Sequence, residues 1–302
     1  MKNSAGDMPL VIEASICPYR HAEPVWDVNG MISEAKACLQ AGAAIVHHHH
    51  DMRFDEQESI SEMLTLGKSV KQEFPDAILY PDFLKAATVS GKIAHITPLA
   101  QAGVLGMVPV DPGRANSGQL DDNGAPVGNN VVQYSFDDAN QTLELARQVR
   151  APLAIGVYES YNLRWALAQE AIGKLPAGTM VKLYFGGEYS LIHIGRRALN
   201  FGLPLTRESI DAYLKMMEGS KLPWCVGLMG DALMDSPVVR YVIERGGHLR
   251  VGIEDAASRS SAGNREMVAA AVELARQVGR PVVQGAAAWA ALGRKATAMA
   301  PA

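Results

Sequence analysis

The most informative segment of the chain is Ala43-Ala44-Ile45-Val46-His47-His48-His49-His50-Asp51. It is typical of a buried strand, because a β-branched apolar run follows Gly42 and leads into polar residues. Successive side chains of a strand point to opposite faces, so His47 and His49 share one face and the other two histidines share the opposite face. Two imidazoles at positions i and i+2 can both reach one divalent ion, since metal–nitrogen bonds are about 2.0–2.1 Å long.

A second apolar segment, Gly246-Gly247-His248-Leu249-Arg250-Val251-Gly252-Ile253-Glu254-Asp255, ends in two adjacent carboxylates. A strand that presents Glu254 and Asp255 at its end offers a metal ligand and a base side by side. Two histidines plus a carboxylate, with an open coordination position, form the ligand set of a catalytic zinc. Arg250 lies four residues before Glu254 and therefore shares its face of a strand, where it would orient the two carboxylates and hold them ionised.

Each segment also has a plainer interpretation. Four consecutive histidines occur in expression tags, but a tag lies at a terminus and this run lies inside a strand pattern. A histidine pair on a strand can be ordinary core or surface, and adjacent acidic residues can cap a following helix. Arg250 can form a buried structural ion pair. Because both segments end apolar strands, we favour a divalent metal centre.

Composition limits the class of protein. The 302 residues are 48% hydrophobic and 20% charged, which is typical of a globular protein of one large domain or two small ones. The net charge of −4 gives no reason to expect a nucleic-acid or membrane partner. Cys17, Cys38 and Cys225 are scattered without a CxxC motif, and neither a signal peptide nor a run of about 18 apolar residues is present. The sequence therefore predicts a cytoplasmic protein.

Strand and helix patterns alternate along the chain. The predicted strands are Leu10–Ile16, Ala44–His49, Ala77–Asp82, Val104–Val110, Leu153–Tyr158, Met180–Phe185, Trp224–Leu228 and His248–Glu254. The predicted helices are Met31–Gln40, Ser59–Glu73, Thr88–Ala102, Phe136–Gln148, Leu163–Lys174, Ile210–Met217, Pro237–Arg245 and Asn264–Val278. Thr88–Ala102 is the weakest, since it contains a glycine and a proline.

Eight such units over this length predict a (β/α)₈ TIM barrel that forms a single catalytic domain over residues 1–302. A doubly wound sheet is the alternative, but no GxGxxG turn follows the first strand. Asp111–Asn130, rich in Gly, Asn, Asp and Pro, is predicted to be a long loop. Pro281–Gly293 is predicted to be a short C-terminal appendage, a strand or turn and a helix.

Active sites of such barrels lie at the C-terminal ends of the strands. The histidine run His47–His50 and the carboxylate pair Glu254-Asp255 both lie at such ends. Further polar residues follow other predicted strands, namely Asp82, Asp111, Tyr158-Glu159-Ser160, Gly186-Gly187-Glu188 and Gly230-Asp231. Any one of these is equally explained as an ordinary loop residue.

The two segments resemble motifs of the β-keto acid cleavage enzymes, a family named for 3-keto-5-aminohexanoate cleavage enzyme. The resemblance rests on Val46-His47-x-His49 and on Gly246-Gly247-His248-x-Arg250-Val251-Gly252-x-Glu254-Asp255. It extends over nearly the whole chain through Glu34-Ala35-x-x-Cys38, Ala41-Gly42-Ala43, Tyr158-Glu159-Ser160, Pro223-Trp224, Asn264-x-Glu266-x-Val268 and Gly279-Arg280-Pro281.

The resemblance implies a (β/α)₈ barrel that binds a divalent metal, most often zinc. It implies a reaction between a β-keto acid and acetyl-CoA that gives acetoacetate and a new acyl-CoA. By position, it implies that His47, His49 and Glu254 are the metal ligands, that Asp255 is the catalytic base and that Arg250 is its partner. Cobalt, nickel or manganese would also suit such a site. The family also implies a homo-oligomer.

The residues around this centre depart from the family pattern. Asp51 stands where the family has an arginine, and Gly230-Asp231 replaces a Gly-Arg pair. Asp82-Phe83-Leu84-Lys85 replaces a Ser-Thr-Gly-Gly turn that resembles part of the carboxylate pocket, and the fourth predicted strand leads into Pro109–Arg114 rather than an asparagine-containing turn. We therefore expect a rebuilt substrate pocket.

The candidate substrate-binding residues are Glu159, Arg20, Asp82 and Lys85. Arg20 follows the first strand at a position that looks acidic in family members acting on amino-bearing keto acids. A guanidinium repels an ammonium group and pairs with a carboxylate, which predicts a preference for anionic or neutral keto acids. A solvated surface arginine and an Asp82–Lys85 ion pair are the plainer alternatives.

Two other function classes remain open. A metal-dependent hydrolase on a TIM barrel would carry His-x-His on its first strand and further histidines on strands five and six. This chain carries the pair on the second predicted strand, and strands five and six lead into Tyr158-Glu159 and Gly186-Gly187. The other class is a binding homologue that kept the metal and lost turnover.

Overall fold

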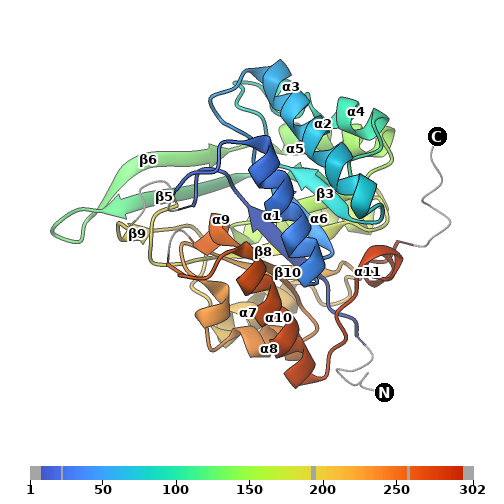
Figure 1. Ribbon diagram of the computed structural model, residues 1–302. Helices are drawn as coiled ribbons and strands as arrows, with labels where there is room; N and C mark the ends of the chain where they lie inside the picture. Colours follow the sequence, from blue (N-terminus) through green and yellow to red (C-terminus); the bar gives the residue numbers. More distant parts are fainter. Residues whose placement is uncertain (1–7, 22, 192–194, 257–258, 295–302) are drawn as a thin grey trace.

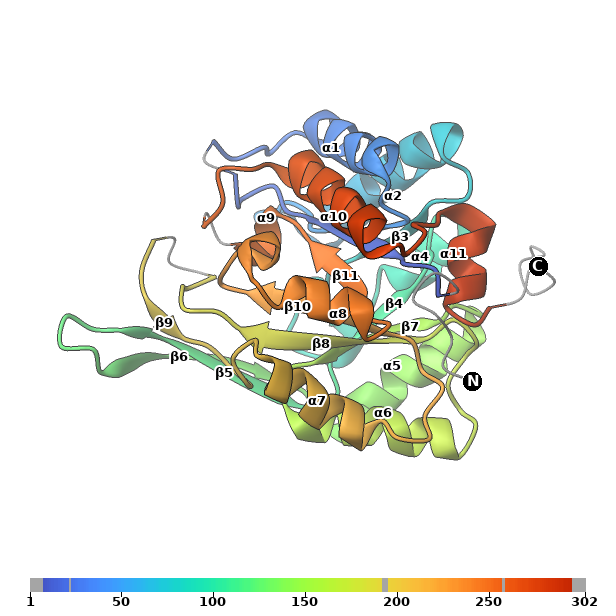
Figure 2. The ribbon, with the colours of Figure 1, turned by 90° about the horizontal axis from the view of Figure 1, so that it is seen from below.

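The computed structural model describes residues 8–21, 23–191, 195–256 and 259–294. Eight parallel strands curl into a barrel, and helices surround it (Figures 1 and 2). The strands are β1 (Ile12–Ile16), β2 (Ile45–His48), β3 (Ile78–Pro81), β4 (Val108–Val110), β7 (Leu153–Val157), β8 (Met180–Gly186), β10 (Trp224–Met229) and β11 (His248–Val251).

The strands follow one another around the barrel in the order β3-β2-β1-β11-β10-β8-β7-β4, so the last strand in sequence pairs with the first. At the seam between β3 and β4, the Gly106 N–H donates to the Leu79 carbonyl at 2.6 Å. The predicted TIM barrel is confirmed. Its extent as one domain over residues 1–302 stays a prediction.

The outer layer consists of helices that alternate with the strands. They are α1 (Val28–Ala41), α2 (Glu56–Glu73), α3 (Val89–Lys92), α4 (Ile96–Gln101), α5 (Phe136–Gln148), α6 (Ser160–Ala171), α7 (Arg207–Met216), α8 (Val239–Glu244) and α10 (Asn264–Val278). Their ends follow local chemistry, since α2 and α5 begin with capping boxes and α1 ends at Gly42 in the left-handed region. The weak predicted helix Thr88–Ala102 is divided into α3 and α4.

The strands are buried on both faces, as parallel sheets require. The outward side chains of the strands pack against the helices. Their inward side chains fill the half of the barrel near the N-terminal ends of the strands. Helix α11 (Gly285–Ala291) covers that end, where Trp289 packs with the inward residues Val11, Ile45 and Met180 (Figure 1). The helix predicted within the C-terminal appendage is confirmed.

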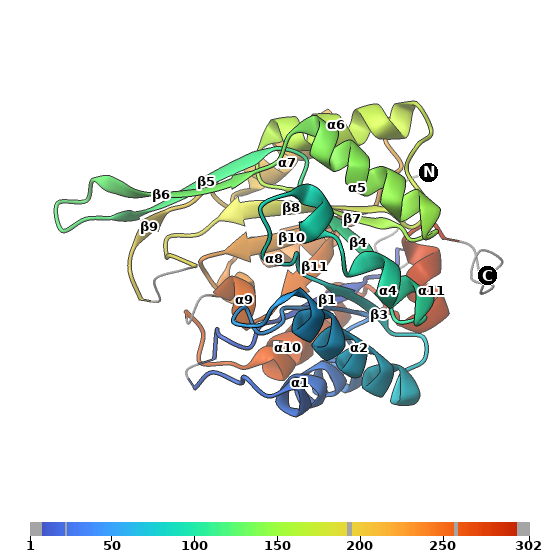
Figure 3. The same ribbon diagram turned by 90° about the horizontal axis from the view of Figure 1, so that it is seen from above.

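The predicted loop Asp111–Asn130 was wrong. Most of it forms the antiparallel strands β5 (Arg114–Leu120) and β6 (Pro126–Gln133), joined along one edge by β9 (Ala198–Leu199). The Gly- and Asp-rich residues make the tip, where the Asp121 carboxylate accepts from two backbone N–H groups and Gly124 has φ 82°. This arm projects beyond the barrel at the end opposite α11 (Figure 3). Because β5 is mostly half-buried and the described side chains of β6 are exposed, these strands lack the alternating apolar pattern that reveals a strand.

The last barrel strand is also shorter than predicted. Strand β11 ends at Val251, and Glu254 and Asp255 lie in the helical turn α9 (Ile253–Ala256). Gly252 makes this change of direction with φ 156°, and a Cβ there would lie 2.1 Å from the Ser15 carbonyl oxygen. The expectation that strand alternation places the two carboxylates is therefore wrong.

No helix in the described ranges is both long and apolar enough to cross a membrane.

Candidate active site

The predicted metal ligands meet at the C-terminal end of the barrel. Glu254 reaches across from α9 to the end of β2, with Oε2 3.5 Å from His47 Nε2 and Oε1 3.1 Å from His49 Nε2. The two imidazole rings lie edge to face with centroids 5.2 Å apart. Two histidines and a carboxylate from distant parts of the sequence thus lie together at the barrel mouth.

This donor set fits a divalent cation. His49 Nε2 faces only the Glu254 carboxylate, and Glu254 Oε2 is buried without a hydrogen-bond partner among the described residues, which is costly unless another group satisfies it. Three carboxyl groups, Glu13, Glu254 and Asp255, surround only two buried cations, Lys182 and Arg250. Imidazole nitrogens and carboxylate oxygens in a region of excess negative charge are suitable ligands for a metal such as Zn²⁺.

The histidines divide between the two faces of β2 as predicted. His47 lies on the site side and packs against Tyr80, with ring centroids 4.6 Å apart and the ring planes tilted by 36°. His48 and His50 are buried away from Glu254. Burial lowers the pKa of His48 to about 3 and that of His50 to about 4, so both imidazoles are neutral packing groups.

A second carboxylate contacts His49 from its other ring nitrogen. Asp82 Oδ2 lies 3.2 Å and the Tyr19 hydroxyl 2.6 Å from His49 Nδ1. Single donor atoms of His47, His49 and Asp82 all lie within 4.8 Å of one another. The suggested Asp82–Lys85 ion pair is wrong, because Asp82 pairs with His49 and the Lys85 side chain is exposed. Metal-binding histidines usually donate their other N–H to such a carboxylate, which fixes the ring.

We expect Asp82→Asn to weaken divalent-metal affinity by about 10–100-fold, the usual effect of losing an outer partner of a ligating histidine. Chelator competition with Zn²⁺ measures the affinity, and Lys85→Ala is the matched control because that side chain is exposed. An unchanged affinity in Asp82→Asn contradicts this role, and complete loss of binding would make Asp82 a direct ligand.

Arg250 holds both carboxylates of α9. Its Nη2 lies 2.7 Å from Glu254 Oε1, and its Nε and Nη2 both donate to Asp255 at 2.9 Å. The side chain is buried, so these charge-assisted bonds act in a low dielectric. The predicted partnership of Arg250 with both carboxylates is present in the structure.

The two carboxylates nevertheless differ in pKa. Burial would raise the pKa of Glu254, but Arg250, His49 and His47 outweigh it and hold the pKa well below its usual range. At Asp255, burial together with the neighbouring Glu254 charge outweighs Arg250 and raises the pKa to about 6. Both carboxylates are therefore mainly ionised at neutral pH, as expected, and the raised pKa of Asp255 suits a base that takes and returns a proton.

Beneath Arg250 lies a charged layer that sequence reasoning missed. Glu13 of β1 accepts hydrogen bonds from Tyr80, Lys182 and Arg250. Burial would raise the pKa of Glu13, but the two cations outweigh it and lower the pKa. A signal existed, since Glu13 and Lys182 are single charges inside otherwise apolar predicted strands, where charged residues are rarely tolerated without a partner.

The candidate substrate residues separate into two places. Arg20 directly follows Tyr19, whose hydroxyl contacts His49. The Arg20 guanidinium carbon lies 5.6 Å from the centroid of the Tyr19 ring, and its Nε is buried without a partner in the described chain. Glu159 lies elsewhere, because its carboxylate accepts from the Gly202 N–H at 3.0 Å and lines a cavity of about 430 Å³ beneath the arm. The structure therefore brings Arg20 and Asp82, but not Glu159, toward the histidines.

Asp111 forms another wall of the barrel mouth. A Cβ added at Gly156 would lie 2.3 Å from Asp111 Oδ1 and within 3.3 Å of the Tyr158 and Tyr184 rings, so the carboxyl group lies against these tyrosines. Burial, with the charge of Asp82, raises the pKa of Asp111 to about 7. From the sequence, Asp111 is only one of several polar residues at strand ends, and no local pattern assigns it a role.

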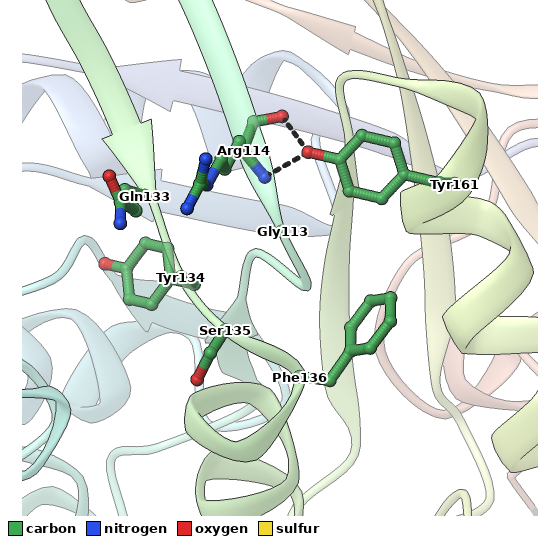
Figure 4. Close-up of a pocket in the computed structure, with 7 residues that line it drawn as sticks. All are labelled: Gly113, Arg114, Gln133, Tyr134, Ser135, Phe136 and Tyr161. Atoms are coloured by element: carbon green, nitrogen blue, oxygen red, sulfur yellow. Dashed lines mark hydrogen bonds between the residues drawn. The ribbon is translucent and has the colours of Figure 1, made fainter.

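A smaller cavity of about 270 Å³ lies where the arm joins the barrel (Figure 4). The Tyr161 hydroxyl bonds to both the backbone N–H and the carbonyl of Arg114 and fastens the root of β5 to α6. The ring centroid of Tyr134, which lines this cavity, lies 5.3 Å from that of Phe83 in the segment after β3. The arm is thus tied to the loops at the barrel mouth.

Comparison with known proteins agrees with this geometry. Residues 24–293 match the family described as beta-keto acid cleavage enzyme. The chain belongs to the β-keto acid cleavage enzyme family. No curated protein matches it in sequence.

Solved structures place this family member among TIM barrels. A ternary complex of ObcA with a C4-CoA adduct and oxalate has a TM-score of 0.64 at 15% identity, over 90% of this chain and 68% of the other. Apo ObcA has a TM-score of 0.64 at 14% identity over 87% of this chain. This chain spans only 64% of the length of that protein. Dihydropteroate synthase from Yersinia pestis, with a pterine-sulfa conjugate, gives 0.51 at 16% identity over 90% and 92% of the two chains. These likenesses concern the fold.

Proposed function

We propose that this family member transfers the carboxymethyl unit of a β-keto acid to the acetyl group of acetyl-CoA in a metal-dependent reaction. The products are acetoacetate and the acyl-CoA of the remaining keto-acid fragment. The observation that carries the proposal is the convergence of His47, His49, Glu254, Asp255 and Arg250 at the barrel mouth of a member of this family.

The reaction exchanges one carbon–carbon bond for another. The bond between the α-carbon and the keto carbon breaks, a bond forms between that α-carbon and the acetyl carbon, and the CoA sulfur passes to the released acyl group. No oxidant or reductant is needed. A ternary complex of ObcA contains a CoA adduct, which supports CoA as a partner of this fold.

The chain's own residues supply the acid–base chemistry. Asp255 takes the α-proton. The Arg250 guanidinium stabilises the Asp255 carboxylate before this proton transfer, and Asp255 returns the proton afterwards. His47, His49 and Glu254 would hold a divalent cation, which when bound supplies Lewis acidity toward the keto oxygen. Zinc suits these donors, and cobalt, nickel or manganese are alternatives.

Arg20 is proposed to bind the substrate carboxylate in place of the family's missing turn. Its unpartnered buried Nε leaves a donor that an anion can satisfy. We expect Arg20→Ala to raise KM for the preferred keto acid by about 10-fold or more, since charged hydrogen bonds contribute about 1.5–3 kcal/mol. Steady-state kinetics with metal analysis tests this, and metal content should not change. Faster cleavage of an amino-bearing keto acid than of neutral or anionic ones by the parent protein contradicts the preference.

The proposed function is tested by incubating Zn²⁺-loaded protein with acetyl-CoA and a panel of β-keto acids. Mass spectrometry should detect acetoacetate and the matching new acyl-CoA in equal amounts. Hydrolysis products without an acyl-CoA would instead indicate a metal-dependent hydrolase. Binding of a keto acid without any product would indicate a non-catalytic homologue. A cytoplasmic location and a homo-oligomeric state stay predictions.

A further inference from the structure

The floor of the proposed active site is the buried layer of Glu13, Lys182, Tyr80 and Arg250. Glu13, Lys182 and Arg250 are 0%, 3% and 1% exposed. One oxygen of Glu13, Oε1, lies 2.7 Å from Arg250 Nη1, 3.0 Å from Lys182 Nζ and 2.6 Å from the Tyr80 hydroxyl. Below this layer the barrel is filled by apolar side chains.

Glu13 completes the set of carboxylates around the Arg250 guanidinium. Nη1 faces Glu13, Nη2 is shared by Glu254 and Asp255, and Nε faces Asp255. A planar guanidinium held at three nitrogens cannot rotate about its long axis without breaking charged hydrogen bonds. Glu254 and Asp255 hold it from the site side, and Glu13 holds it from the floor.

Stability alone does not explain this layer. Buried ion networks are often no more stable than apolar residues of similar volume, and the barrel below is already filled by such residues. Glu13 also separates two cations, because Lys182 and Arg250 contact the same oxygen. Without the carboxylate, these cations would repel each other and push Arg250 toward the residues above it.

We propose that Glu13 is a positioning residue that fixes the Arg250 guanidinium and thereby sets the spacing of Glu254 and Asp255. Lys182 balances the charge of Glu13 so that it can stay buried. This inference rests on the proposed function, its catalytic part on the proposed reaction and its metal-binding part on the proposed metal ligands.

The test uses Glu13→Gln, Lys182→Met and the double variant Glu13→Gln/Lys182→Met. Glu13→Gln leaves Lys182 as a buried ammonium without a carboxylate partner. The double variant also removes that ammonium, and it still lacks the Glu13 carboxylate that pairs with Arg250. Arg280→Met is the outside control, since Arg280 is buried at the other end of the barrel and bonds only to backbone carbonyls among the described residues. Each protein is measured for melting temperature, for Co²⁺ affinity and visible spectrum without substrate, and for kcat and KM.

We expect the double variant to regain the melting temperature lost in Glu13→Gln. Its Co²⁺ affinity should stay about 10–100-fold weaker than the parent's, with an altered spectrum, as for loss of an outer partner. Its kcat should fall more than its KM rises. Arg280→Met should lower the melting temperature without changing the Co²⁺ spectrum.

Two results would overturn the proposal. The first is a double variant with parental Co²⁺ affinity, spectrum and kcat, which would leave Glu13 a purely structural role. The second is failure of both Glu13 variants to fold while Lys182→Met folds. If the parent protein shows no turnover, the proposed function fails, and the Co²⁺ measurements still decide the role of Glu13.

Discussion

His49→Ala is expected to abolish stoichiometric binding of a divalent metal. The parent should bind about one equivalent per chain, and the variant should lose at least about 100-fold in affinity, more than the loss of an outer partner costs. The reason is geometric, because His49 Nε2 lies 3.1 Å from Glu254 Oε1 and alanine removes this proposed metal ligand. His47→Ala should behave in the same way. Elemental analysis and Zn²⁺ competition with a chelator measure the effect.

His48 and His50 provide controls within the same run of four histidines. His48→Ala and His50→Ala should keep about one equivalent of metal, although both side chains are buried and their removal will cost stability. Metal content is therefore compared only among variants that remain folded. Equal loss of metal from all four alanine variants would show that the division of the histidines between two faces is not what determines binding.

Asp255→Asn is expected to leave metal content intact and to lower kcat by about 10²–10⁴-fold, the usual contribution of a positioned base. Asparagine keeps the shape of the side chain and an oxygen that can accept from Arg250, but it cannot take a proton. Its measurement is steady-state turnover of the keto acid identified in the panel, together with metal analysis of the same sample.

Full turnover by Asp255→Asn would move the role of base to another group. Glu159, which follows the fifth predicted strand, is one candidate for that role, but its carboxylate accepts from the Gly202 N–H beneath the arm. Asp111 is the better second candidate, because it lies in the barrel mouth against Tyr158 and Tyr184 and its pKa is raised to about 7. Asp111→Asn is the variant to compare.

Local sequence patterns predicted most of the fold. Apolar strands and amphipathic helices alternate strongly enough to identify all eight barrel strands and the helix of the appendage. The arm was missed because its apolar residues are few and do not alternate regularly with polar ones, so no period-two pattern marks its strands. The end of β11 was misplaced because a single glycine, Gly252, turns the chain into α9 within an apolar run.

The sequence by itself determined the barrel, the two faces of the His47–His50 run and the candidate ligand set, because these depend on local periodicity and on short motifs. Only the tertiary structure brought Asp82 and Tyr19 to His49, separated Glu159 from the histidines, and gathered Glu13, Tyr80 and Lys182 beneath Arg250. These contacts join residues up to 237 positions apart. They depend on which strands lie opposite each other across the barrel and on how far each side chain is buried, and neither property is encoded in a local pattern.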